Sequence, residues 1–87
     1  MNKKIYIGTN TKMYKTVTDT MSYLHELNDL TCTLSEEDVE LFVIPSFIAL
    51  DRSKEFLTDK HIKLGAQNMH WEDMGQFTGE ISPLMLK

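Results

Sequence analysis

The stretch VELFVI at 39–44 constrains the fold of this chain more than any other feature of the sequence. Its last four residues, Leu41 to Ile44, are all apolar, with no polar position between them. A strand of this kind needs cover on both faces, which is the usual situation of a strand in a parallel sheet packed between helices. The pattern therefore predicts an α/β fold.

Two further apolar stretches predict strands on either side of this one, at 4–8 (KIYIG) and 62–66 (IKLGA). Apolar residues recur at three- and four-residue spacing in two intervening segments, as in amphipathic helices, and we expect helices at 17–30 and 47–57. The order strand, helix, strand, helix, strand is typical of right-handed βαβ units, and it predicts that all three strands are parallel.

Two helix starts carry recognisable capping residues. Thr16 can cap the first helix, with Asp19 three residues later favouring the positive end of the helix dipole. Ser82 and Pro83 occupy the N-cap and first-turn positions of a third helix, which we expect to start at 83. Because three parallel strands leave two open edges, residues 1–87 are expected to be the N-terminal segment of one larger domain.

Composition narrows the classes of partner. Nine Lys and Arg residues stand against thirteen Asp and Glu, and the basic residues do not cluster, so we expect no nucleic-acid partner. The single cysteine, Cys32, allows no intrachain disulfide. None of the three histidines has a second ligand at metal spacing, and we expect no metal site. The sequence shows no signal peptide or membrane span, which predicts a soluble, cytoplasmic protein without a membrane partner.

The first candidate site is the stretch GTNTKM at 8–13, which begins at the end of the first strand. In extended backbone Asn10 and Lys12 point the same way, and active sites of parallel α/β proteins gather at the carboxyl ends of strands. Lys12 is a mobile charge suited to a phosphate or a developing oxyanion, and Asn10 can both donate and accept hydrogen bonds. The alternative is a solvated loop that happens to contain these residues.

A second candidate is the long segment at 64–82, LGAQNMHWEDMGQFTGEIS. Loops longer than about 12 residues are usually functional or disordered. Trp71, Met74 and Phe77 would be costly to leave in water, which favours an interface, although the loop could instead fold back on its own core.

These segments together resemble the triosephosphate isomerase family. GTNTKM is similar to its first strand loop, VIPSFIALDRSKEFL at 43–57 to its second strand and helix, and LGAQNMHWEDMGQFTGEISPLML at 64–86 to its third strand and loop. The resemblance implies the N-terminal part of a (βα)8 TIM barrel, fewer than three of its eight units. It also implies a cytoplasmic, cofactor-independent, homodimeric enzyme of glycolysis and gluconeogenesis, which interconverts an aldose and a ketose triose phosphate through an enediolate.

By matching position, the resemblance makes Asn10 and Lys12 substrate-binding residues, with Lys12 also a catalytic residue that supports negative charge on the phosphate and the enediolate. It assigns a further set to the dimer contact, with the last of them helping to hold the loop: Met13, Gln76, Phe77, Thr78, Gly79 and Glu80.

Two departures from the family pattern leave alternatives open. Thr11 stands where an aromatic residue is common, which allows a paralogous tetrulose phosphate isomerase. The second departure is length. This family is a well-known example of tuned acid–base catalysis by a Glu base and a neutral His, and in the family both residues come later in the chain than residue 87. A barrel of this type takes roughly 250 residues. The 87 residues alone are therefore expected to be inactive, and a non-catalytic module that binds a partner through its 67–80 loop is the remaining alternative.

Overall fold

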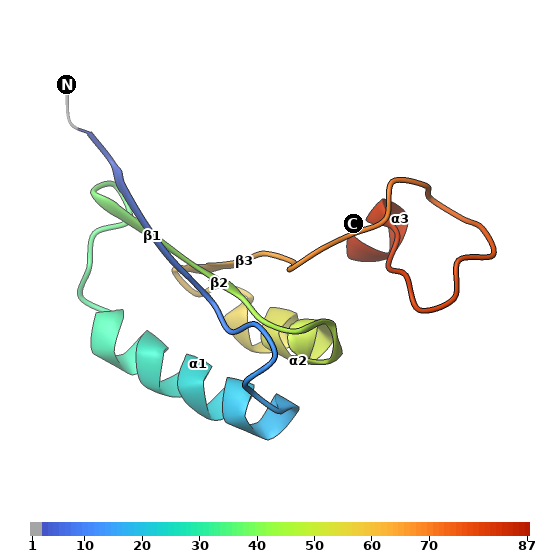
Figure 1. Ribbon diagram of the computed structural model, residues 1–87. Helices are drawn as coiled ribbons and strands as arrows, with labels where there is room; N and C mark the ends of the chain where they lie inside the picture. The colour runs from blue at the N-terminus through green and yellow to red at the C-terminus, as the bar shows by residue number, and fades with distance from the viewer. Residues whose placement is uncertain (1–2) are drawn as a thin grey trace.

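The computed structural model describes residues 3–87, and a three-stranded sheet with helices on one face forms its centre (Figure 1). The elements follow one another as β1 (Ile5–Asn10), α1 (Val17–Thr31), β2 (Val39–Ile44), α2 (Phe47–Leu57), β3 (Ile62–Leu64) and α3 (Pro83–Leu86). The strands lie in the order β1-β2-β3 and both pairings are parallel. The prediction of a parallel α/β fold, as in the N-terminal part of a TIM barrel, is confirmed.

Two of the three predicted strands have different bounds in the structure. β1 begins one residue later and ends two residues later than 4–8, because its pairing with β2 runs from Ile5 opposite Val39 to Asn10 opposite Ile44. β3 is shorter than 62–66, although Gly65 still donates its N–H to the Val43 carbonyl at 2.9 Å. The helix predicted at 47–57 has those bounds, and the one predicted at 17–30 extends by one residue.

One face of the sheet packs against α1 and α2 and forms the core. Leu41 and Val43 of β2 point to this face, since alternate residues of a strand share a side. They are buried with Leu24 of α1, Leu57 of α2 and Ile62 of β3. The helices thus cover the apolar residues on one face of the central strand.

The opposite face of the sheet carries Gly8 of β1 beside Phe42 of β2, which are partners in the strand register. The Phe42 ring lies over Gly8 so closely that a Cβ on Gly8 would come within 2.0 Å of it. The absence of a side chain at position 8 therefore gives the ring its place on this face.

The helices begin where the sequence predicts. Thr16 Oγ1 accepts a hydrogen bond from the Asp19 N–H at 3.1 Å, and Asp19 Oδ2 accepts one from the Thr16 N–H at 3.4 Å, which completes a capping box. Ser82 Oγ accepts from the Met85 N–H at 3.1 Å, with Pro83 in the first turn of α3.

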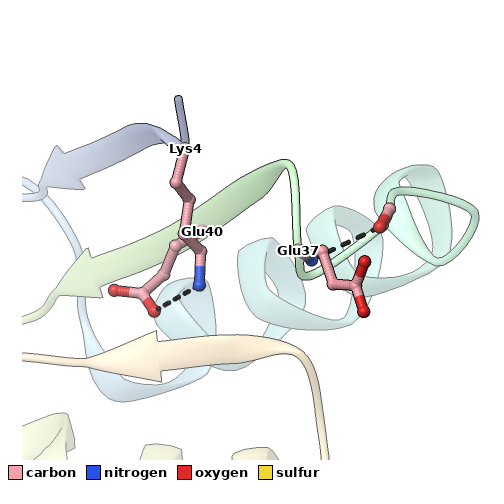
Figure 2. A network of polar contacts seen from close by, with 4 residues as sticks. Lys4, Glu37 and Glu40 are labelled. Atoms are coloured by element: carbon pink, nitrogen blue, oxygen red, sulfur yellow. Dashed lines mark hydrogen bonds and ion pairs between the residues drawn. The ribbon is translucent and has the colours of Figure 1, made fainter. Parts of the chain in front are cut away.

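The amino ends of the strands carry a charged contact far from the edge where the candidate site lies. Lys4 Nζ lies 3.4 Å from Glu40 Oε1, and nearby the Glu37 N–H donates to Ser35 Oγ in the turn before β2 (Figure 2). Both charged side chains are partly exposed, so this pair stabilises the fold little. No helix within residues 3–87 is long and apolar enough to cross a membrane.

We expect Leu24→Ala to destabilise the fold by about 2–4 kcal/mol, because it removes a fully buried side chain from between α1 and the sheet. The matched control is Leu30→Ala on the same helix, where the side chain is 74% exposed and the cost should be below about 0.5 kcal/mol. Urea denaturation of each variant against the wild type measures both. Equal effects would contradict the described orientation of α1.

Candidate functional site

A groove lies at the carboxyl ends of the strands, where the chain leaves β1 and β2. The Thr11 N–H donates to the Ile44 carbonyl at 3.1 Å, so the pairing of β1 with β2 extends one residue beyond the strand. The groove is lined by Asn10, Lys12, Met13, Ser46, Phe47, Ile48 and Gln67. Residues that follow all three strands therefore meet at one edge of the sheet, as expected for parallel strands.

Lys12 adopts an unusual backbone conformation at this edge. Its φ is +50°, a value that costs a residue with a side chain about 1–2 kcal/mol. Asn10 Oδ1 accepts a hydrogen bond from the Lys12 N–H at 2.8 Å and so closes a tight turn. With its oxygen engaged in this way, the Asn10 side chain keeps its NH₂ group available to a ligand.

Gln67, which follows β3, also contacts this turn. Its Nε2 donates to the Lys12 carbonyl at 3.0 Å and to the Ile44 carbonyl at 3.2 Å. The Thr11 hydroxyl lies at 3.5 Å from the same nitrogen, and Thr11 is buried. One side chain thus connects the residues that follow β1, β2 and β3.

The charge of the groove comes from one residue. Lys12 is the only charged side chain among the described residues that line it, although the chain as a whole carries a net charge of −4. Ser46 Oγ is buried and has no hydrogen-bond partner within residues 3–87, and it makes no cap contact to α2. Met13, Phe47 and Ile48 supply apolar surface. Such a groove suits a small anion that also carries hydroxyl or carbonyl groups.

The prediction that Asn10 and Lys12 lie in extended backbone, with their side chains pointing the same way, is wrong. The positive φ of Lys12 ends the extended geometry at this residue. The two residues nevertheless line the same groove, because the tight turn that they form holds them together. Their contact with a substrate stays a prediction.

Gln67 was not singled out from the sequence as a site residue. It lies only three residues after β3, at the carboxyl edge where such sites gather, and this position is the one signal that could have indicated it. Its bonds to residues 11, 12 and 44 could not be read from spacing, because they depend on the strand register.

The long loop after β3 extends away from the sheet, together with α3 (Figure 1). Trp71 and Met74 are each 81% exposed, and Phe77 is 42% exposed. The loop is organised around His70, which is buried, stacks on Trp71 at 4.1 Å and contacts Phe77 at 4.2 Å between ring centroids. The His70 N–H donates to the Ile81 carbonyl at 2.7 Å and so closes the base of the loop.

The residues that the resemblance assigns to a dimer contact lie on exposed surface. Met13 is 96% exposed in the turn that carries Lys12, and the end of the loop forms a turn in which the Glu80 N–H donates to the Phe77 carbonyl at 3.1 Å. Gly79 has a φ of +84° in this turn, which a residue with a side chain rarely adopts. The remaining members of the set, Gln76 and Thr78, are exposed.

The other two histidines lie away from the groove. His25 is exposed on α1, and its ring contacts Phe56 of α2 at 3.9 Å between centroids. His61 Nε2 lies 2.6 Å from Thr31 Oγ1, within hydrogen-bonding distance, and Thr31 also contacts the Leu27 carbonyl. No group of three His, Cys, Asp or Glu side chains in the described part of the chain could hold a metal ion.

Comparison with known proteins gives consistent matches along the chain. A family profile described as triosephosphate isomerase matches residues 5–87. The chain is 48% identical over 83 residues to the L-erythrulose-1-phosphate isomerase of Rhizobium etli, and this alignment covers 95% of the chain and 31% of the relative. It is 51% identical over 87 residues to the triosephosphate isomerase of Alkaliphilus metalliredigens, covering 100% of the chain and 34% of the relative. The chain spans about a third of the length of the curated relatives that it matches.

We expect Asn10→Ala to speed hydrogen exchange of the Lys12 amide by roughly threefold to tenfold, because a hydrogen bond of this kind contributes about 0.5–1.5 kcal/mol. Asn10→Asp keeps an acceptor oxygen and should leave the exchange rate close to that of the wild type. Exchange followed by NMR measures both. An unchanged rate in the alanine variant would show that the turn does not depend on this contact.

Proposed function

The chain belongs to the triosephosphate isomerase family, and from this premise we propose that it supplies the first part of an aldose–ketose isomerase of a small sugar phosphate. The observation that carries the proposal is the groove, where Lys12 is the one charged side chain among the lining residues of 3–87 and Asn10 is the neighbouring amide. A phosphorylated sugar has both an anionic group and adjacent oxygens, and this pairing of side chains suits such a ligand.

In the proposed reaction a proton leaves the carbon next to the substrate carbonyl, an enediolate forms, and a proton returns to the neighbouring carbon. Negative charge grows on the substrate oxygens between these two transfers. Lys12 binds the phosphate and stabilises this charge, and Asn10 contributes its free NH₂ group. No Asp, Glu or His lines the groove among the described residues, so the groups that move the proton come from elsewhere in the protein.

The substrate is a triose phosphate or a tetrulose phosphate. Relatives named triosephosphate isomerase and relatives named L-erythrulose-1-phosphate isomerase match the chain at similar identity, and the two substrate classes differ by one hydroxymethyl group. We propose the triose phosphate as the substrate and keep the tetrulose phosphate as the alternative that Thr11 suggests.

We also propose that the protein is a homodimer. The exposed aromatic and methionine side chains of the 67–80 loop suit burial against a second copy. The family resemblance implies that the loop around Phe77 enters a pocket of this copy near its active site. A loop that His70 closes and stacks in this way is already ordered for docking, which lowers the entropy lost on association.

The test is a chimera in which this chain replaces the matching third of the Alkaliphilus metalliredigens triosephosphate isomerase. We expect isomerase turnover with glyceraldehyde 3-phosphate, and Lys12→Ala should lower kcat/KM by about 10²–10³-fold, because one preorganised electrostatic contact typically contributes that much. L-Erythrulose 1-phosphate is assayed in parallel with the unaltered Alkaliphilus metalliredigens enzyme, and turnover of this sugar that is higher in the chimera would favour the tetrulose phosphate.

A folded chimera without turnover on either sugar phosphate would count against the proposed function, and a lysine variant as active as its parent would remove Lys12 from the mechanism. The 87-residue chain by itself should show no turnover above that of its own Lys12→Ala variant. Activity in that assay would contradict the absence of a proton-transferring group from the groove.

For the dimer, we expect Phe77→Ser in the chimera to weaken self-association by at least about tenfold, since aromatic anchors dominate the binding energy of interfaces. Leu30→Ser is the control, because Leu30 is 74% exposed on α1 and lies outside the loop. Analytical ultracentrifugation over a range of concentrations gives both dissociation constants. Equal constants would place the interface elsewhere.

A further inference from the structure

We propose that Gln67 is a positioning residue, which holds Lys12 in the pose needed to bind an anion. This inference rests on the proposed function, because it takes Lys12 as the residue that contacts the phosphorylated substrate. It goes further in assigning a role to a side chain that lies on another part of the chain, 55 residues away in sequence.

The evidence begins with how the Lys12 backbone is held. Its N–H donates to the side-chain oxygen of Asn10 at 2.8 Å, and its carbonyl accepts from the side-chain nitrogen of Gln67 at 3.0 Å. Both polar groups of the Lys12 backbone are therefore bound by side chains, one from the end of β1 and one from beyond β3. The left-handed φ of +50° costs a lysine free energy, and these two contacts are the hydrogen bonds that can offset this cost.

The second step concerns the fit of the amide. An NH₂ group has two hydrogens, and the two shorter contacts of Gln67 Nε2 are to the carbonyls of Lys12 and Ile44. The Ile44 carbonyl also accepts the Thr11 N–H, so it is fixed in the sheet. Gln67 thus links the Lys12 carbonyl to the Ile44 carbonyl at the end of β2, which the sheet already holds in place. Glutamate has the same size but, when ionised, cannot donate to either carbonyl.

A side chain that merely joined loops to the sheet would also make these bonds. The two roles differ in what they change. Loss of a structural strap lowers thermal stability or the fraction of folded protein, but leaves each folded molecule with its normal affinity for an anion. Loss of a positioning residue alters KM and the affinity for phosphate in protein that is fully folded.

The experiment uses the chimera described above, with Gln67→Met and Gln67→Glu as two replacements of nearly equal length. Methionine donates to neither carbonyl, and glutamate donates to neither in its ionised form, so we expect KM to rise about tenfold or more and kcat/KM to fall by about 10–100-fold, since a displacement of about 1 Å can have effects of this size. The inhibition constant of inorganic phosphate should rise with KM, and a crystal structure of either variant should show Lys12 away from φ +50°.

The matched control is Thr58→Val, which removes another side-chain hydrogen bond to a backbone carbonyl, 2.8 Å from Lys54 O at the end of α2. It should leave KM and the phosphate constant unchanged. Thermal unfolding of all variants shows that they are folded, and the two replacements at position 67 guard against one of them failing to fold.

Unchanged KM and phosphate affinity in folded Gln67 variants, with Lys12 still at its original φ, would overturn the inference. Failure of the proposed function has a different signature, namely a folded parent chimera that turns over neither sugar phosphate. In that case phosphate binding, measured by calorimetry, and the conformation of Lys12 still test whether Gln67 holds the lysine.

Discussion

The parallel pairing of β1 with β2 is the constraint on which the rest of this structure depends. It runs without interruption from Ile5 opposite Val39 to Asn10 opposite Ile44, and the Thr11 N–H continues it by one further bond. Because the two strands run the same way and end level with each other, the residues after them emerge at one edge of the sheet. Burial of Leu41 and Val43 beneath the helices keeps β2 in this register, since a shift of one residue would turn both side chains away from the core.

The turn at this edge shows how a costly backbone conformation is stabilised. Lys12 has a φ that lysine rarely adopts, and its N–H and carbonyl are bound by the side chains of Asn10 at the end of β1 and Gln67 beyond β3. Gly79 also has a positive φ, but a glycine adopts it at little cost because it has no side chain. A glycine at position 12 would relieve the strain but would remove the one charged side chain that lines the groove among residues 3–87. A lysine at this position of the tight turn therefore keeps the charge at a cost in backbone strain.

Much of the fold could be predicted from the sequence because local signals and packing agreed. The apolar run at 39–44 predicted a strand of a parallel sheet, and the capping residues Thr16 and Ser82 mark helix starts in the structure as in the sequence. The cover expected on both faces of that strand is found on one face only, where α1 and α2 pack on Leu41 and Val43, while Phe42 and Ile44 stay half-buried within the described residues. The end of β1 was placed too early, since Thr9 and Asn10 are polar and only their pairing with Val43 and Ile44 makes them part of the strand.

The site was harder to predict, because its geometry depends on contacts between distant residues. Asn10 and Lys12 could be proposed from their place after a strand, but the spacing argument assumed a backbone that Lys12 does not adopt. Gln67 bonds to Lys12 across 55 residues of sequence, in an arrangement set by the pairing of three strands, so no local periodicity or motif predicts this hydrogen bond. The burial of His70 between two aromatic rings likewise comes from the course of the loop and not from its composition.

The Phe42 ring that lies over Gly8 has a consequence for how the sequence can change. The Phe42 ring occupies the space that a side chain at position 8 would need, so a larger residue at position 8 is compatible only with a smaller residue at position 42. Natural variants of this chain should therefore exchange bulk between the two strands as a coupled pair, and a lone increase in size at position 8 should stay rare wherever an aromatic ring occupies position 42.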